Sequence, residues 1–169
     1  IGKATPAFSC QVRGLDDRMK EAGLVSPPVD RNERRYLPHA LAGQLIFEEY
    51  LGRQGWRSPH AKALASVIGA HHGIPATPAT YITGCTHRHL LGGDVWKQTH
   101  DELIELVTER VGVEPLLPEW SRRTWSQSFL VVLSGLVIMA DWLASTETYF
   151  PLIARGGDRA AGLAPLTRS

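Results

Sequence analysis

His71 and His72 stand side by side where a helical pattern stops, and Asp141 follows a long apolar stretch. Imidazole nitrogens together with a carboxylate suit borderline divalent metals such as manganese, iron, cobalt, nickel or zinc better than calcium. A carboxylate placed against an apolar helix loses hydration and needs a partner, and a cation is the simplest partner. These three residues therefore indicate a buried metal site, with His39 as a further candidate ligand.

Each of these residues also has an ordinary structural explanation. One of the adjacent histidines could cap the helix carbonyls while the other packs in the core. Asp141 could cap the following turn or pair with an arginine such as Arg155, and a lone histidine such as His39 is more often a surface or core residue than a ligand. Residue types and spacing alone leave both interpretations open.

Two further groups could take part in chemistry. Ser145 lies four residues after Asp141, so on a continuing helix its hydroxyl could reach a phosphate oxygen or a metal-bound water, although a local turn bond is an alternative. Cys85, His87 and His89 offer thiolate and imidazole ligands for zinc. Their spacing by two is not that of structural zinc sites and no fourth ligand is apparent, which favours a role without metal.

The elements that must position these residues are predicted to be helices. Apolar residues recur mostly at helical steps and no segment alternates for long, so the predicted class is all-α. The expected helices cover residues 37–51, 59–72, 99–111 and 121–143. Gly73 and Pro75 end the second of these, and Gly73 permits a turn that aims one of the two adjacent histidines. The last is expected to be the core helix at the centre of a compact multi-helix bundle, with the metal site between helices.

Composition restricts the setting of the protein. A chain of 169 residues with 43% hydrophobic residues can form one compact domain. The net charge of +1 excludes a general electrostatic attraction to nucleic acid or membranes, so a polyanion would need a local patch. Two cysteines are too few for a disulfide scaffold and indicate a reducing compartment, for which we expect the cytoplasm. The uncharged residues 124–140 fall short of the roughly 20 apolar residues that span a membrane.

Four ordered blocks of the sequence resemble one family. They are residues 1–8 (IGKATPAF), 39–43 (HALAG), 68–73 (IGAHHG) and 140–145 (ADWLAS). Together they resemble the HD nuclease domain of the helicase-nuclease of type I CRISPR systems over nearly the whole chain. The resemblance implies an HD-type helical bundle in which His39, His71, His72 and Asp141 hold metal.

In that family, the segment similar to residues 1–8 directly follows a His-Asp dyad, and another ligand histidine lies further upstream. Neither is in this sequence, so the resemblance implies that this chain carries the later ligands and lacks the earlier ones, unless those belong to a preceding segment that was cleaved or omitted. We therefore expect residues 1–154 to be an N-terminally incomplete HD nuclease domain, and residues 155–169 to be a tail or linker toward a following domain. The chain alone is expected to bind metal weakly and to cleave poorly.

The resemblance also implies an activity and partners. Family members use one or two divalent transition metal ions to hydrolyse the phosphodiester backbone of single-stranded DNA, and here Lys3 or Ser145 would orient the scissile phosphate. An ATP-dependent helicase domain in the same or a companion chain, and an RNA-guided CRISPR surveillance complex, would be partners; no membrane is expected. Alternatives are an HD phosphohydrolase acting on nucleotides and a catalytically inactive helical docking module.

Overall fold

The computed structural model describes residues 1–26 and 28–150, and within them it is helical without strands, which confirms the all-α prediction. The predicted tail, residues 155–169, lies outside the described residues. The helices are α1 (Pro6–Ser9), α2 (Leu15–Glu21), α3 (His39–Arg53), α4 (Ser58–Gly69), α5 (Pro78–Thr86), α6 (Asp94–Val111), α7 (Leu117–Trp120) and α8 (Gln127–Ala144). Short 3-10 turns are η1 (Glu33–Tyr36), η2 (Arg88–Leu91) and η3 (Glu114–Leu116).

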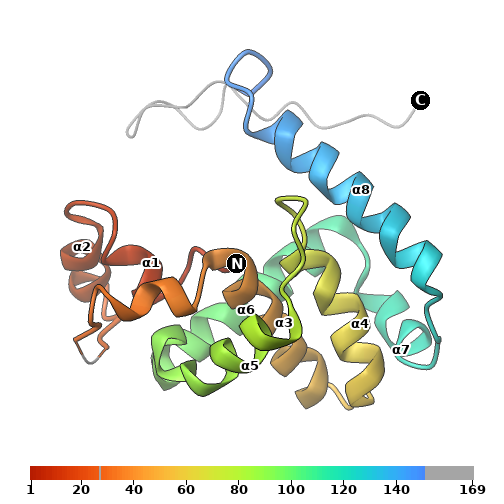
Figure 1. Ribbon diagram of the computed structural model, residues 1–169, viewed down its shortest axis with the longest axis horizontal. Helices are drawn as coiled ribbons and strands as arrows, with labels where there is room; N and C mark the ends of the chain where they lie inside the picture. The colour runs from red at the N-terminus through yellow and green to blue at the C-terminus, as the bar shows by residue number, and fades with distance from the viewer. Residues whose placement is uncertain (27, 151–169) are drawn as a thin grey trace.

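Helices α3 and α4 form the centre of the molecule and pack along one another (Figure 1). Small residues make this close approach possible. Ala61 and Ala65 of α4 are fully buried, and a Cβ added at Gly69 would lie 2.1 Å from Oε1 of Gln44 on α3. Because Gly69 is the last residue of α4, this tight contact fixes the point from which the chain leaves α4 toward His71.

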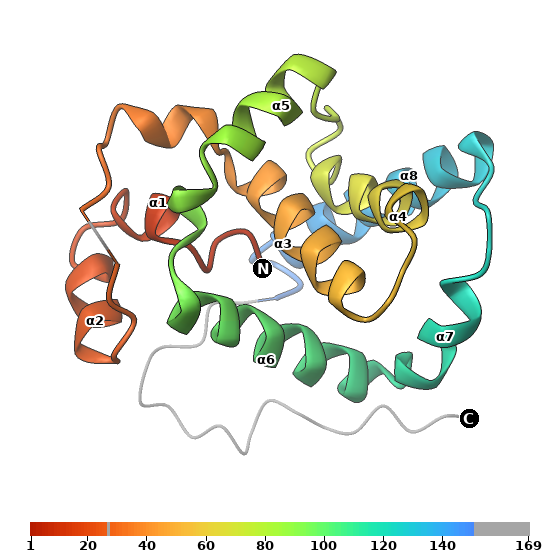
Figure 2. The ribbon, with the colours of Figure 1, turned by 90° about the horizontal axis from the view of Figure 1, so that it is seen from below.

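Helix α6 runs along the other side of α3 (Figure 2). It begins at Asp94, five residues before the predicted start at residue 99. Its buried residues Trp96, His100 and Ile104 recur every four positions, so they form one face of the helix. This face packs toward the core, while Leu106 and Val107 remain exposed.

Residues 1–5 contact both α3 and α6. A Cβ at Gly2 would lie only 1.8 Å from the carbonyl oxygen of His39, so Gly2 sits directly on the beginning of α3. The buried Nε2–H of His100 donates to the carbonyl oxygen of Ala4 at 2.5 Å, and the Thr5 hydroxyl donates to the carbonyl oxygen of Gly2 at 3.2 Å. These contacts hold the N-terminal segment beside His39.

The prediction that the last helix is the core helix of the bundle is wrong for this chain. Helix α8 packs mainly against α4 at the edge of the molecule (Figure 1), and Leu130 is its one buried residue. Apolar composition shows that a helix favours burial, but it does not show that the partner lies in the same chain. With a mean hydropathy of 1.7, α8 is also the one helix in the described residues that is long and apolar enough to span a membrane, a test that core helices of soluble proteins pass as well.

Candidate metal centre

The end of α4 brings the two adjacent histidines to one place. The helix ends at Gly69, three residues before the predicted end at residue 72, and a turn closes where the Gly73 N–H donates to the Ala70 carbonyl oxygen at 2.7 Å. Gly73 has a φ of 86°, which other residues rarely adopt. Because His71 and His72 lie in this turn and not in the helix, their rings can point the same way, with centroids 4.0 Å apart.

His39 completes a group of three imidazoles. It is the first residue of α3, and its Nε2 lies 2.8 Å from Nε2 of His72. One ring nitrogen from each of His39, His71 and His72 lies within 4.8 Å of the others. The structure thus gathers residues from two helix ends into a set of nitrogen donors of the kind that transition metals and zinc prefer.

Asp141 reaches the edge of this cluster from α8. Its Oδ2 lies 3.8 Å from Nδ1 of His72, which is an ion-pair distance if the imidazole is protonated. The expected burial is wrong: the side chains of Asp141 and His72 are 36% and 50% exposed. The site is therefore open to solvent and to a large ligand.

A backbone contact orients the ring of His71. Its Nδ1 lies 2.7 Å from the carbonyl oxygen of Ile68. A carbonyl oxygen only accepts hydrogen bonds, so Nδ1 carries the proton and the lone pair of the neutral ring is on Nε2. This is the pattern of a metal-binding histidine, in which the second nitrogen donates to a backbone carbonyl.

The surroundings of His39 favour its neutral form. Burial lowers the pKa of His39, the neighbouring imidazoles and the charge of Lys3 lower it further, and the carboxylate of Asp141 acts in the opposite direction. An imidazole must be neutral to bind a metal ion, so the lowered pKa of His39 favours cation binding by the cluster. The exposed Lys3 directly follows Gly2, whose backbone packs against the carbonyl oxygen of His39, so Lys3 lies near this end of the cluster.

Ser145 is less clearly part of the site. It caps the C-terminal end of α8, where its backbone N–H donates to the carbonyl oxygen of Asp141 at 2.9 Å. Its side chain is exposed, and in the described part of the chain no hydrogen bond links its hydroxyl to the histidines. The structure therefore brings Lys3 to the cluster more clearly than Ser145.

The trio of Cys85, His87 and His89 does not form a metal-binding group within residues 1–26 and 28–150. The ring of His87 stacks on Tyr36 with centroids 4.6 Å apart, and His89 contacts a carboxylate oxygen of Glu33 at 3.0 Å. These contacts join η2 and the end of α5 to η1, which is a structural role.

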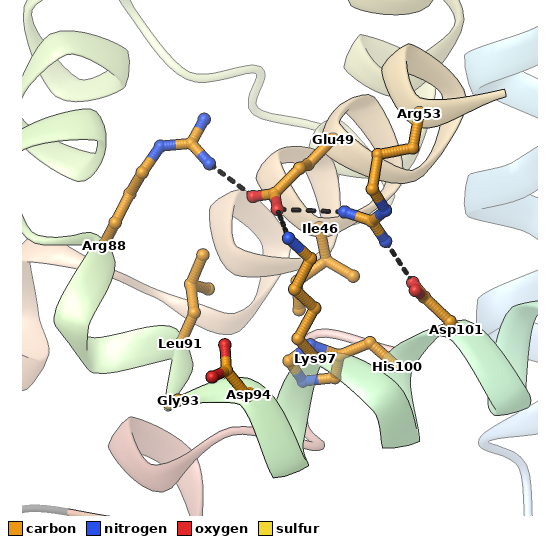
Figure 3. Close-up of a pocket in the computed structure, with 11 residues that line it drawn as sticks. Ile46, Glu49, Arg53, Arg88, Leu91, Gly93, Asp94, Lys97, His100 and Asp101 are labelled. Atoms are coloured by element: carbon orange, nitrogen blue, oxygen red, sulfur yellow. Dashed lines mark hydrogen bonds and ion pairs between the residues drawn. The ribbon is translucent and has the colours of Figure 1, made fainter. Parts of the chain in front are cut away.

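Charged residues also line a pocket between α3, η2 and α6 (Figure 3). The Glu49 carboxylate is bound by Arg88, Lys97 and Arg53, and Arg53 also pairs with Asp101. Because these charges are already paired, the pocket offers no free donor set comparable with the histidine cluster.

Sequence analysis missed His100, for which the only signal is its four-residue spacing from Trp96 and Ile104.

Comparison with known proteins gives one family. Residues 1–150 match the family described as Cas3, HD domain. The chain is 30% identical over 152 residues to a CRISPR-associated endonuclease/helicase Cas3 of Thermus thermophilus, with 89% of this chain and 16% of the relative covered. It is 28% identical over 180 residues to a CRISPR-associated nuclease/helicase Cas3 of Streptococcus thermophilus, covering 91% and 18%. The chain thus spans less than a fifth of the length of these relatives.

Two crystal structures share the fold. One is the Thermus thermophilus Cas3 HD domain in the presence of Ni2+, with a TM-score of 0.59, 26% identity, and coverage of 95% of this chain and 54% of that one. The other is a CRISPR-associated protein with a TM-score of 0.70 and 25% identity, covering 90% of this chain and 16% of that one. The first of them confirms the predicted HD-type bundle.

Proposed function

Because the chain belongs to the Cas3 HD-domain family, as its four sequence blocks indicate, we propose that it is the metal-dependent part of a CRISPR-associated nuclease that hydrolyses single-stranded DNA. The convergence of His39, His71 and His72 carries this proposal. Their nitrogens would hold one or two divalent transition metal ions, and Asp141 would supply an anionic ligand. The donor set fits such ions, and the related HD domain crystallised in the presence of Ni2+ supports the choice.

Each residue has a defined task in this proposal. A bound divalent ion polarises phosphoryl oxygens and acidifies water, so that no protein nucleophile is needed. The hydrogen bond from Nδ1 of His71 to the Ile68 carbonyl oxygen leaves the Nε2 lone pair free to bind a metal ion. The lowered pKa of His39 keeps that ring neutral. Lys3, whose charge acts on His39, would bind a non-bridging oxygen of the scissile phosphate, and Ser145 would assist by hydrogen bonding.

The exposure of the site favours a polymer as substrate. Half of the His72 side chain and about a third of Asp141 face solvent, whereas a site for free nucleotides usually encloses its ligand. An HD phosphohydrolase acting on nucleotides is the second candidate for the same cluster. An inactive docking module is the third candidate, because the His-Asp dyad of the family is missing from this sequence, so that this chain alone would bind metal weakly and cleave poorly.

The relatives are described as nuclease/helicase proteins, so we propose a helicase domain in the same or a companion chain as partner. Delivery of the DNA by an RNA-guided surveillance complex in the cytoplasm is part of the same proposal. An ATP-driven helicase would supply the single strand that the open site accepts.

Metal titration tests the proposal directly. Ni2+ or Mn2+ binding to the purified protein is measured by calorimetry, for the parent and for His39→Ala, His71→Ala and His72→Ala. Each change is expected to lower the affinity about tenfold or more, whereas His89→Ala, which removes an exposed imidazole paired with Glu33, leaves it unchanged. Unaltered binding in all three variants would leave the docking module as the surviving interpretation.

Activity is tested on the protein encoded by the complete reading frame, with circular single-stranded DNA and free nucleotides offered side by side. We expect cleavage of the circular strand that chelators abolish. Hydrolysis of nucleotides alone would reject the nuclease in favour of the phosphohydrolase.

A further inference from the structure

Helix α8 has a second apolar face that no other described element covers. Five of its exposed apolar residues recur every three or four positions, and they are 44% to 63% exposed: Phe129, Val132, Leu136, Met139 and Leu143. We call this set the outer face of α8. The opposite side, which includes the buried Leu130, packs against α4. A three-and-four spacing is the one by which a helix packs lengthwise against another helix.

The outer face of α8 is more apolar than is usual for a solvent-exposed helix face. Soluble proteins rarely leave large contiguous apolar patches exposed, and such patches commonly mark interaction surfaces. The outer face also adjoins the candidate metal centre, because Asp141 of the same helix contacts His72. Whatever covers α8 therefore also comes close to the histidines.

The comparisons indicate which segment could pack on the outer face of α8. The chain aligns with only 54% of the solved Thermus thermophilus HD domain, so almost half of that domain has no counterpart here. The sequence of residues 151–169 is a poor candidate, since its large apolar residues Leu152 and Ile153 are separated from Leu163 and Leu166 by a Gly- and Arg-containing run. A membrane is also a poor candidate, because Asp141 lies within α8 and ties the helix to the histidine cluster.

We propose that the outer face of α8 is the docking surface for a helical segment of the same HD domain that lies outside residues 1–169. The segment packs lengthwise along α8 and presents an apolar stripe to Val132, Leu136 and Met139. This inference rests on family membership and on the outer face itself, and it does not require nuclease activity.

Cysteine labelling tests the docking surface. In a background with Cys10→Ser and Cys85→Ser, single cysteines are introduced by Met139→Cys or Val132→Cys on the outer face. Arg57→Cys, at the exposed N-cap position of α4, is the control. Maleimide reaction rates are compared between the 169-residue chain and the protein encoded by the complete reading frame. We expect both outer-face sites to react at least about tenfold more slowly in the complete protein, with the control unchanged.

Several outcomes would overturn the proposal. Equal rates in both proteins would do so, as would a reading frame that encodes nothing beyond this chain. Slow labelling that depends on the concentration of the 169-residue chain would indicate a second copy, and protection only by phosphatidylglycerol vesicles would indicate a lipid surface.

Crosslinking identifies the occupant. A benzophenone group attached at Met139→Cys is photolysed in the complete protein, and the linked peptides are mapped by mass spectrometry. Links to a segment of the HD domain outside residues 1–169 support the proposal, whereas links to the helicase part, to residues 151–169 or to a second copy contradict it. Repeating the labelling with His71→Ala separates the two proposals, because docking persists even if metal binding and cleavage fail.

Discussion

At the scale of single residues, the candidate metal centre depends on the close contact between Gly2 and the start of α3. A Cβ at position 2 would lie 1.8 Å from the carbonyl oxygen of His39 and 2.7 Å from the backbone nitrogen of Gly43. Both neighbours are backbone atoms, which cannot move aside as a flexible side chain can. The identity of residue 2 therefore controls where His39 lies.

Gly2→Ala is predicted to destabilise the fold by about 1–3 kcal/mol, because a methyl group in a filled space forces the N-terminal segment away from α3. The measurement is urea unfolding followed by circular dichroism. Gly52→Ala in α3 is the matched control, since a Cβ there meets no atom within 4 Å, and higher helix propensity should stabilise it by up to about 1 kcal/mol. Equal effects of the two changes would contradict the packing argument.

His100 provides a pH-dependent prediction at the same scale. Burial lowers its pKa, and the hydrogen bond to Ala4 opposes this only partly. The unfolded chain, with a histidine pKa of about 6.5, takes up a proton before the folded chain does, so stability is lost as the pH falls below that value. His39 shifts in the same direction and contributes to the same loss.

His100→Gln is expected to flatten this loss, because the amide can donate to the Ala4 carbonyl oxygen but cannot take up a proton. His100→Leu removes the donor and should cost about 1–3 kcal/mol at every pH. Free energies of unfolding measured between about pH 5 and pH 8, across the histidine range, separate the two variants. An unchanged slope in His100→Gln would show that His100 is not a source of the dependence.

At the scale of elements, the Glu49 carboxylate joins α3 to η2 and α6. Arg88 of η2 binds it at 2.8 Å, and Lys97 of α6 and Arg53 of α3 each bind it at 2.9 Å (Figure 3). Burial alone would raise the pKa of Glu49, but the hydrogen bond and charge of Lys97, together with the two arginines, outweigh it and lower the pKa. The stabilisation is therefore present at neutral pH and is lost as acid protonates the carboxylate.

Glu49→Gln is predicted to destabilise the protein by about 1 kcal/mol, a modest value because every partner is about one third or more exposed. The difference from the parent should shrink in high salt, which screens exposed charges. Thermal unfolding at low and high salt measures both effects. Glu119→Gln, which removes one exposed pair with Arg123, is expected to change little, and an equal loss there would argue against a special role for Glu49.

The elements also show what the sequence could predict. Apolar spacing and the Pro and Gly signals are local, so the helix at residues 37–51 was placed within two residues of α3. The contacts of His100 and Glu49 join residues 96 and 39 positions apart, and no local pattern records them. The position of α8 was mispredicted for a different reason, since its apolar composition indicates burial without saying where the covering partner lies.

At the scale of the whole molecule, the candidate site connects α8, which lies at the edge, to the closely packed pair of α3 and α4. His39 belongs to α3 and His72 to the turn after α4, whereas Asp141 belongs to α8, which packs mainly against α4. A ligand that binds all of them should therefore attach α8 more firmly. Anything that binds only the folded state also stabilises it, by about 2.7 kcal/mol at a hundredfold excess over Kd.

Ni2+ is accordingly predicted to raise the free energy of unfolding and to slow amide exchange in α8, because the Asp141 carboxylate can then join the histidines in binding one cation. Asp141→Asn should keep most of the affinity, which the three imidazoles provide, but lose the slowing of exchange in α8. Hydrogen exchange with mass spectrometry, with Ni2+ and with a chelator, measures both; His71→Ala should show neither effect. If α8 exchanges equally fast with and without Ni2+ in the parent chain, or if Asp141→Asn behaves like the parent, the carboxylate is not part of the site. The centre would then consist of imidazoles alone.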